Sequence, residues 1–310
     1  MKNIWIRGWQ TSKPLMLTGQ LMLFNLAVCL GGLALDPTLI TGQPAWLKPA
    51  KFAISVALFS FTLTWILSFV DRSPRLTRAM AWIVSAVFVV EIVIIDVQAA
   101  RGTTSHFNTA TVLDRTLFST MGVGIAMLWV CSMILTGVLF RQYFADRSWG
   151  WALRLGMLIS VLGMGLGGFM TVPTRQQIRE ANLTRKMPVS GAHTIGAPDG
   201  GPGLPGTGWS TEHGDMRPAH FLGMHAMQTL PLIAWFTRRR RSMGTVQLAA
   251  ASHFSLFAIL VWQALRGQSI VQPDSATVLA LGIWAVGTLV GMFAVTHRRP
   301  EMTLATGHHS

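Results

Sequence analysis

The chain has 310 residues, of which 51% are hydrophobic and 12% are charged, and its formal net charge is +13. This composition leaves too little polar surface to solvate a compact globule of that size, which excludes an ordinary soluble fold. A nucleic-acid-binding protein is also excluded, because the Lys and Arg residues lie in short loops between apolar stretches instead of on one contiguous basic face.

Eight apolar stretches follow one another along the chain. A helix rises ~1.5 Å per residue, so about 20 residues cross the ~30 Å hydrocarbon core of a bilayer, and each stretch is close to that length. The sequence therefore predicts an all-α, polytopic transmembrane helical bundle of about eight spans, with residues 1–310 forming a single transmembrane domain in the lipid bilayer. The predicted spans are approximately 14–35, 51–70, 79–98, 117–140, 150–170, 218–236, 246–265 and 276–296.

Short basic loops predict the orientation of these spans. Lys and Arg precede the first span and follow the second, fourth, sixth and eighth spans, so they all fall on one side. Because basic loops are retained in the cytoplasm, both termini are expected to be cytoplasmic, in the cell inner membrane. Lys48 and Lys51 are exceptions, because they do not fall on the side of the other basic residues. The basic residues that carry the argument are Lys2, Arg7, Lys13, Arg72, Arg75, Arg78, Arg141, Arg147, Arg238, Arg239, Arg240, Arg241, Arg298 and Arg299.

The first stretch is expected to remain as a helix and not to be cleaved as a signal peptide, because it contains Gln20 and Asn25 and lacks a clear cleavage site. The two cysteines, Cys29 and Cys131, each fall inside a predicted span. A disulfide framework and a Cys-based zinc site are therefore not expected.

One connection, residues 171–217 between the fifth and sixth spans, is much longer than the others. Its Gly- and Pro-rich part at 196–208 disfavours regular secondary structure, which fits a flexible loop. The His and acidic residues around it favour instead an ordered extracytoplasmic cap that lies on the bundle. Gly163 and Gly167 in the fifth span predict close helix packing, and Pro231 predicts a kink in the sixth.

Most chemically capable side chains are expected at the cap end of the bundle. Glu91 and His225 each lie about seven residues inside the outer ends of their spans, hence roughly 10 Å deep, and are expected to be partners. Gln98 shares a helical face with Glu91, and Gln228 shares one with His225. Acids at membrane depth mark paired or water-lined positions.

These residues predict an outward-facing His/carboxylate site. Glu91, His106, His220 and His225 are the candidate metal ligands, for zinc or iron, because imidazole and carboxylate suit these ions. The His residues could equally be axial ligands of a haem. The candidate catalytic residues are Glu91, His106 and Asp114; the candidate cofactor-binding residues are His220, His225 and Gln228; Gln98, Asp114 and Gln228 would orient the ligands.

The leading functional hypothesis is a haem- or metal-dependent membrane oxidoreductase. A solute or ion transporter is the main alternative, and a Glu–His pair that only fixes helix registry is another. His253, on an apolar face, is expected to be a hydrogen-bonded core residue. A nucleophile at Ser105 is disfavoured, because adjacent residues such as Ser105 and His106 diverge by ~100° on a helix.

Three segments carry a resemblance to known proteins. Residues 98–108 (QAARGTTSHFN), 193–205 (HTIGAPDGGPGLP) and 219–231 (AHFLGMHAMQTLP) resemble an uncharacterised family of bacterial multi-span integral membrane proteins, over about 46–235. That resemblance implies a bacterial inner-membrane protein and no particular mechanism.

A second resemblance is to the membrane metal-hydrolase superfamily of ceramidases and progestin-receptor-like proteins, whose sites combine a Ser–His element, an Asp and a terminal HxxxH. Ser105, His106 and Asp114 are similar to the first two elements, and they imply a membrane-embedded metal-dependent hydrolase. The closing pair here is instead His220 and His225, five residues apart, and eight predicted spans replace seven.

Overall fold

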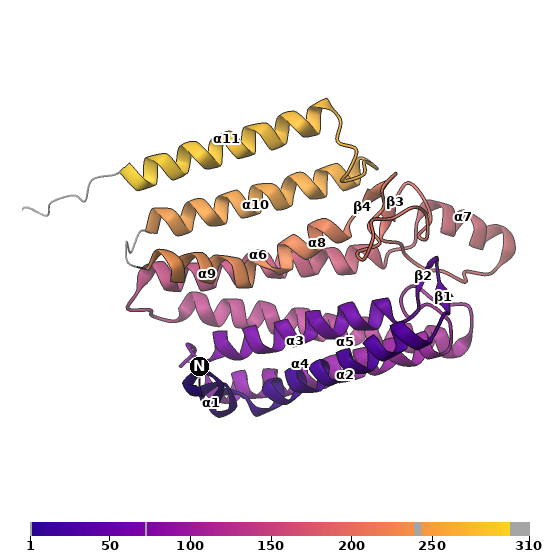
Figure 1. Ribbon diagram of the computed structural model, residues 1–310, viewed down its shortest axis with the longest axis horizontal. Coiled ribbons are helices and arrows are strands. Elements are labelled where there is room, and N and C mark those ends of the chain that lie inside the picture. The colour runs from indigo at the N-terminus through magenta and orange to yellow at the C-terminus, as the bar shows by residue number, and fades with distance from the viewer. Residues whose placement is uncertain (1, 72, 239–242, 298–310) are drawn as a thin grey trace, which may run out of the picture.

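The computed structural model describes residues 2–71, 73–238 and 243–297. These residues form a bundle of long helices with two very short antiparallel sheets, as expected for an all-α polytopic membrane protein (Figure 1). Six of the basic residues used to predict the orientation, Arg72, Arg239, Arg240, Arg241, Arg298 and Arg299, lie outside the described residues.

The helices and strands follow one another in chain order. They are α1 (Lys2–Thr11), α2 (Lys13–Leu35), β1 (Leu39–Ile40), β2 (Gln43–Pro44), α3 (Leu47–Leu67), α4 (Pro74–Ala100), α5 (Val112–Arg141), α6 (Arg147–Met170), α7 (Arg175–Thr184), β3 (Thr194–Ile195), β4 (Gly214–Asp215), α8 (Arg217–Met224), α9 (Ala226–Thr237), α10 (Met243–Leu265) and α11 (Ser275–His297).

Seven helices in the described part of the chain are long and apolar enough to cross a membrane: α2, α3, α4, α5, α6, α10 and α11. They lie side by side with nearly parallel axes, and α11 packs against α10 at the edge of the bundle (Figure 1). The large apolar side chains that α11 exposes, such as Leu279, Ile283 and Phe293, suit contact with lipid. The protein is therefore a multi-pass membrane protein.

The predicted sixth span is not one continuous helix. It consists of α8 and α9, which meet at His225 and both pack against α6. Two carbonyls near the junction accept hydrogen bonds from other helices: Ser160 Oγ donates to Met224 O at 3.0 Å, and His253 Nε2 donates to Leu222 O at 2.9 Å. Side chains that take over helix carbonyls interrupt the regular i to i−4 pattern, so the break lies at His225 and not at Pro231. His253 is hydrogen-bonded, as expected.

Glycines bring α6 and α8 into very close contact. A Cβ atom placed on Gly163 would lie 2.5 Å from Met224 N and 2.7 Å from Gly223 Cα. No L side chain fits at that distance, so the two backbones touch only because both positions are Gly. The close packing predicted for the fifth span is therefore confirmed at Gly163, whereas Gly167 faces the ring of His220.

The structure has two distinct ends, seen at opposite sides of Figure 1. The cap end carries β1, β2 and the connection 171–217, which contains α7, β3 and β4. The opposite end, called here the basic end, carries α1 and the loops around Arg75, Arg141 and Arg238.

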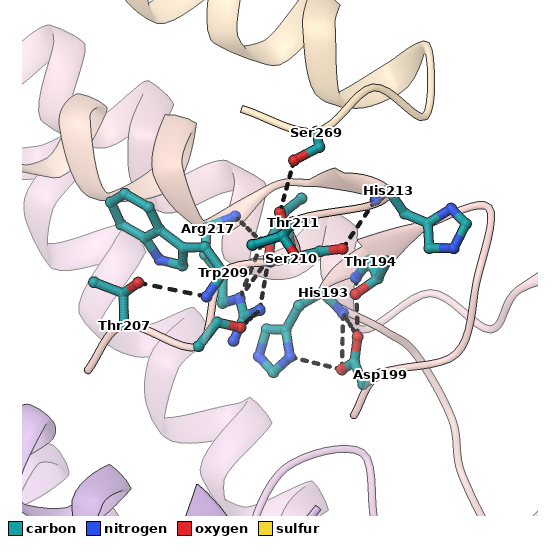
Figure 2. A network of polar contacts seen from close by, with 12 residues as sticks. His193, Thr194, Asp199, Thr207, Trp209, Ser210, Thr211, His213, Arg217 and Ser269 are labelled. Atoms are coloured by element: carbon teal, nitrogen blue, oxygen red, sulfur yellow. Dashed lines mark hydrogen bonds and ion pairs between the residues drawn. The ribbon is translucent and has the colours of Figure 1, made fainter. Parts of the chain in front are cut away.

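Two carboxylates organise the connection at the cap end, and Figure 2 shows the first of them, Asp199. Asp199 accepts from the backbone N–H groups of His193 and Thr194 at 3.0 Å, and Asp215 accepts from Ser210 N at 2.8 Å and from Arg217. Each carboxylate thus satisfies several N–H groups in a segment whose Gly and Pro residues disfavour helices and strands.

Three contacts then tie this connection to the bundle. Lys51 Nζ donates to Thr207 O at 3.0 Å, Arg217 Nη2 donates to Gly208 O at 2.6 Å, and Ser269 Oγ donates to Ser210 O at 3.0 Å. Because these donors belong to α3, α8 and the α10–α11 loop, the connection is held over the bundle on several sides.

Candidate functional site

The predicted site residues occupy the cap half of the bundle but come from separate elements. His106 lies in the α4–α5 loop, His220 in the first turns of α8, His225 at the α8–α9 junction, and Glu91 lies nine residues before the end of α4 at Ala100. The structure therefore places them on different elements and in different surroundings.

The predicted four-residue metal site is not formed. Within the described residues, no group of three or more His, Cys, Asp and Glu side chains is placed to hold a metal ion. These side chains lie on separate elements and have different neighbours: His220 contacts Gly163 O, His106 contacts Ser105, and His225 packs against the ring of Phe221, whose centroid lies 4.2 Å away.

Glu91 does not pair with His225. Its side chain is 3% exposed, and neither carboxylate oxygen makes a hydrogen bond to any part of the chain that the structure describes. Gly124 on α5 leaves room beside it, since a Cβ there would lie 3.8 Å from Oε1. The charge of Lys48, at the start of α3, acts on this carboxyl group.

Asp114 is the acceptor of a hydrogen-bonded group at the start of α5. It accepts from Arg101 Nη1 at 2.8 Å, from Gln98 Nε2 at 2.9 Å and from Thr111 Oγ1 at 2.6 Å. Thr111 in turn caps α5 by accepting from Asp114 N. Gln98 therefore orients Asp114, and not Glu91 as the shared helical face suggested.

Ser105 and His106 are hydrogen-bonded to each other, contrary to expectation. They lie in a loop and not on a helix, so their side chains converge, with Oγ and Nδ1 3.1 Å apart. The His106 ring packs between Phe52 and Phe107, at centroid distances of 5.5 and 6.2 Å. Burial lowers the pKa of His106 well below its usual value, and the charges of Lys48 and His193 add to this effect. His106 is therefore neutral at pH 7.

His193 was not among the predicted site residues, but the structure gives it a carboxylate partner and an aromatic neighbour (Figure 2). Its Nδ1 lies 2.7 Å from Asp199 Oδ2, and because a carboxylate accepts, Nδ1–H donates. The Nε2 atom of a neutral ring then carries the lone pair. The Phe107 ring packs edge-on against the imidazole at 4.8 Å.

Burial lowers the pKa of His193, although its contact with Asp199 opposes that shift. Burial alone would raise the pKa of Asp199, but hydrogen bonds and charge from His193, with the N–H of Thr194, hold it well below its usual range. The pair is therefore a neutral imidazole beside an ionised carboxylate.

His220 has the same arrangement with a different acceptor. Its Nδ1 lies 2.7 Å from Gly163 O, which can only accept, so Nδ1–H donates and Nε2 carries the lone pair. Gly167 leaves space beside the ring, because a Cβ there would lie 3.4 Å from Cε1. The glycines of α6 thus both admit α8 and fix the orientation of this imidazole.

These imidazoles are neighbours. The charge of His193 acts on both His106 and His220. All three rings are partly exposed, and their Nε2 atoms make no hydrogen bond to the described residues. We call His106, His193 and His220 the histidine cluster. Two of its three members were predicted from the sequence, and Gln228 lies outside it, donating to Thr62 Oγ1 at 3.3 Å.

One sequence signal could have identified His193. Asp199 follows it by six residues, and Gly196 and Pro198 lie between them, so a turn that brings the carboxylate back to the imidazole is expected.

Comparisons of the chain with protein-family profiles, with curated proteins and with solved structures found no match.

Proposed function

We propose that this protein is a membrane oxidoreductase and that His193 and His220 would hold a haem at its cap end through their Nε2 atoms. The observation that carries the proposal is that both rings donate through Nδ1 to a fixed oxygen, at 2.7 Å in each case, which leaves Nε2 as an unprotonated ligand atom. Histidines that ligate metals almost always hold their second ring nitrogen in this way, with a carboxylate or a backbone carbonyl.

The ligand count favours haem over a single metal ion. A zinc site takes at least three protein ligands, and no such group exists among residues 2–71, 73–238 and 243–297. A porphyrin supplies four nitrogens itself, so iron needs only one or two imidazoles from the protein. His193 and His220 are close enough for the charge of one to act on the other, and the low pKa of His193 keeps its lone pair available at neutral pH.

The test is the haem content of protein purified from cells supplied with a haem precursor. Wild-type protein is expected to show a Soret band, and His193→Ala and His220→Ala are each expected to lose most of it. His213→Ala is the matched control, because His213 lies in the same connection but contributes only its backbone N–H to the network. Wild-type protein without a Soret band, or full haem content in both variants, would overturn the proposal.

A second candidate, a transporter or proton path, is favoured by a separate observation. Several buried polar atoms of the bundle interior make no hydrogen bond to the described residues: both oxygens of Glu91, Ser60 Oγ, Ser85 Oγ and Gln228 Oε1. Buried polar atoms without partners indicate internal water or a passing solute. Uptake of a solute or protons into proteoliposomes that disappears in Glu91→Gln would favour this candidate over the oxidoreductase.

We also propose the bacterial inner membrane as the location, with both termini in the cytoplasm and residues 171–217 outside. The described basic residues at the basic end, including Arg75, Arg147 and Arg238, support this orientation. Reporter fusions at Arg147 and Gly203 test it: a cytoplasmic signal at Gly203 would contradict the orientation.

A further inference from the structure

At the basic end, far from the histidine cluster, a cavity of about 390 Å³ opens where α3 ends, α6 begins and α9 ends. We call it the aromatic pocket. The lining residues that matter for its chemistry are Trp65, Phe69, Asp146, Trp149, Trp235 and Arg238.

Aromatic rings form one wall of the pocket. Trp65 and Phe69 each pack edge-on against Trp149, with centroids 5.4 and 5.3 Å away. Trp side chains concentrate at the level of lipid headgroups, because one side of the ring system prefers hydrocarbon while the N–H prefers water. Since the pocket lies at the ends of membrane-spanning helices, its rings are at the depth where a headgroup meets the acyl chains.

Two opposite charges line the same pocket. Asp146 Oδ1 accepts from Trp149 N at 3.1 Å and so caps α6, while its other oxygen has no hydrogen bond within the described chain. The guanidinium of Arg238 lies 4.7 Å from the centroid of the Trp235 ring and forms no ion pair with a described residue.

These groups match a zwitterionic headgroup. We propose that the aromatic pocket binds an aminophospholipid: its primary ammonium contacts Asp146, and its phosphate accepts from Arg238. A primary ammonium donates hydrogen bonds to a carboxylate, which a choline group cannot do. An anionic lipid without an amine would bring its phosphate to Arg238. The charge of Asp146 would then have no ammonium beside it and would repel the lipid.

The experiment measures quenching of the pocket tryptophans by brominated lipid in detergent micelles, using phosphatidylethanolamine, phosphatidylglycerol and phosphatidylcholine. The pocket is expected to bind phosphatidylethanolamine at least tenfold more tightly than the other two lipids. Asp146→Asn removes the charge but keeps the helix cap, because Asn caps helices as well as Asp does. It is expected to abolish that preference, whereas Arg238→Gln weakens binding of all three lipids.

Arg147→Gln is the matched control, because Arg147 is exposed and adjacent to Asp146 but does not line the pocket. Its binding is expected to equal that of the wild type. A second arm adds soluble glycerophosphoethanolamine: displacement of the lipid supports headgroup recognition, and no displacement at saturating concentration shows binding through acyl chains and overturns it. Equal affinity for the three lipids, or an unchanged preference in an Asp146→Asn variant that melts like the wild type, would also overturn the proposal.

Discussion

The close contact between α6 and α8 provides a quantitative test, through Gly163→Ala. The new methyl group would lie 2.5 Å from Met224 N, 2.6 Å from Gly223 C and 2.7 Å from Gly223 Cα. All three atoms belong to the backbone, so no side-chain rotation relieves the contact and α8 must move away from α6. Overpacking of this kind costs about 1–3 kcal/mol, and backbone contacts put it near the upper value.

Alanine also favours a helix interior over glycine by about 1 kcal/mol, so a net loss of roughly 2 kcal/mol is expected. At about 2–4 °C per kcal/mol for a large domain, the melting temperature should fall by roughly 4–8 °C. A thiol-reactive dye suits the measurement, because Cys29 and Cys131 are both buried and become reactive only on unfolding.

Gly168→Ala is the control in the same helix, since a Cβ there meets no atom within 4 Å. It is expected to melt at or slightly above the wild-type temperature. Because Gly163 O also holds the ring of His220, Gly163→Ala should reduce haem content as well. If Gly163→Ala melts as high as Gly168→Ala, the described packing of α6 against α8 is wrong.

Three further predictions can be checked with the same melting assay. Asp114→Ala should lower the stability by about 2–3 kcal/mol, because it leaves the Arg101 guanidinium without its carboxylate; an unchanged melting temperature would refute this role. The pKa of His106 is lowered in the folded state, so at acidic pH the unfolded chain binds more protons than the folded protein. The free energy of unfolding should therefore be full above about pH 6.5 and should fall as the pH falls below it, by at most ~1.4 kcal/mol per pH unit. His106→Gln should flatten this dependence, and an equal slope in the variant would contradict it. Ser160→Ala should cost about 1 kcal/mol, because Met224 O loses its donor, and no loss would show that the hydroxyl does not stabilise the helix break.

The helical spans could be predicted because apolar length is a local property of the sequence. The break at His225 could not, because the donors that interrupt the helix come from Ser160 on α6 and His253 on α10. Pro231 was the only local signal in that span, and it lies inside α9. A kink imposed by neighbouring helices is a tertiary effect that no single segment encodes.

The candidate site, too, could be predicted where it depends on local sequence and could not be predicted where it depends on tertiary contacts. Counting residues from the ends of straight helices gave depths for Glu91 and His225, but it did not determine which neighbours their side chains face. The pairing of His193 with Asp199 depends on the path of a Gly- and Pro-rich connection, which has no periodicity to guide a prediction. His220 could be selected from the sequence, although its carbonyl partner on Gly163 could not.

The most direct test of a haem between His193 and His220 is a reduced-minus-oxidised absorption spectrum of the purified protein after reconstitution with haemin. The wild type and His213→Ala are expected to show a Soret band that shifts reversibly between oxidised and reduced forms, whereas the His193→Ala and His220→Ala double variant should show only the spectrum of free haem. A wild-type spectrum that matches the double variant, in protein with a cooperative melting transition, would contradict the account.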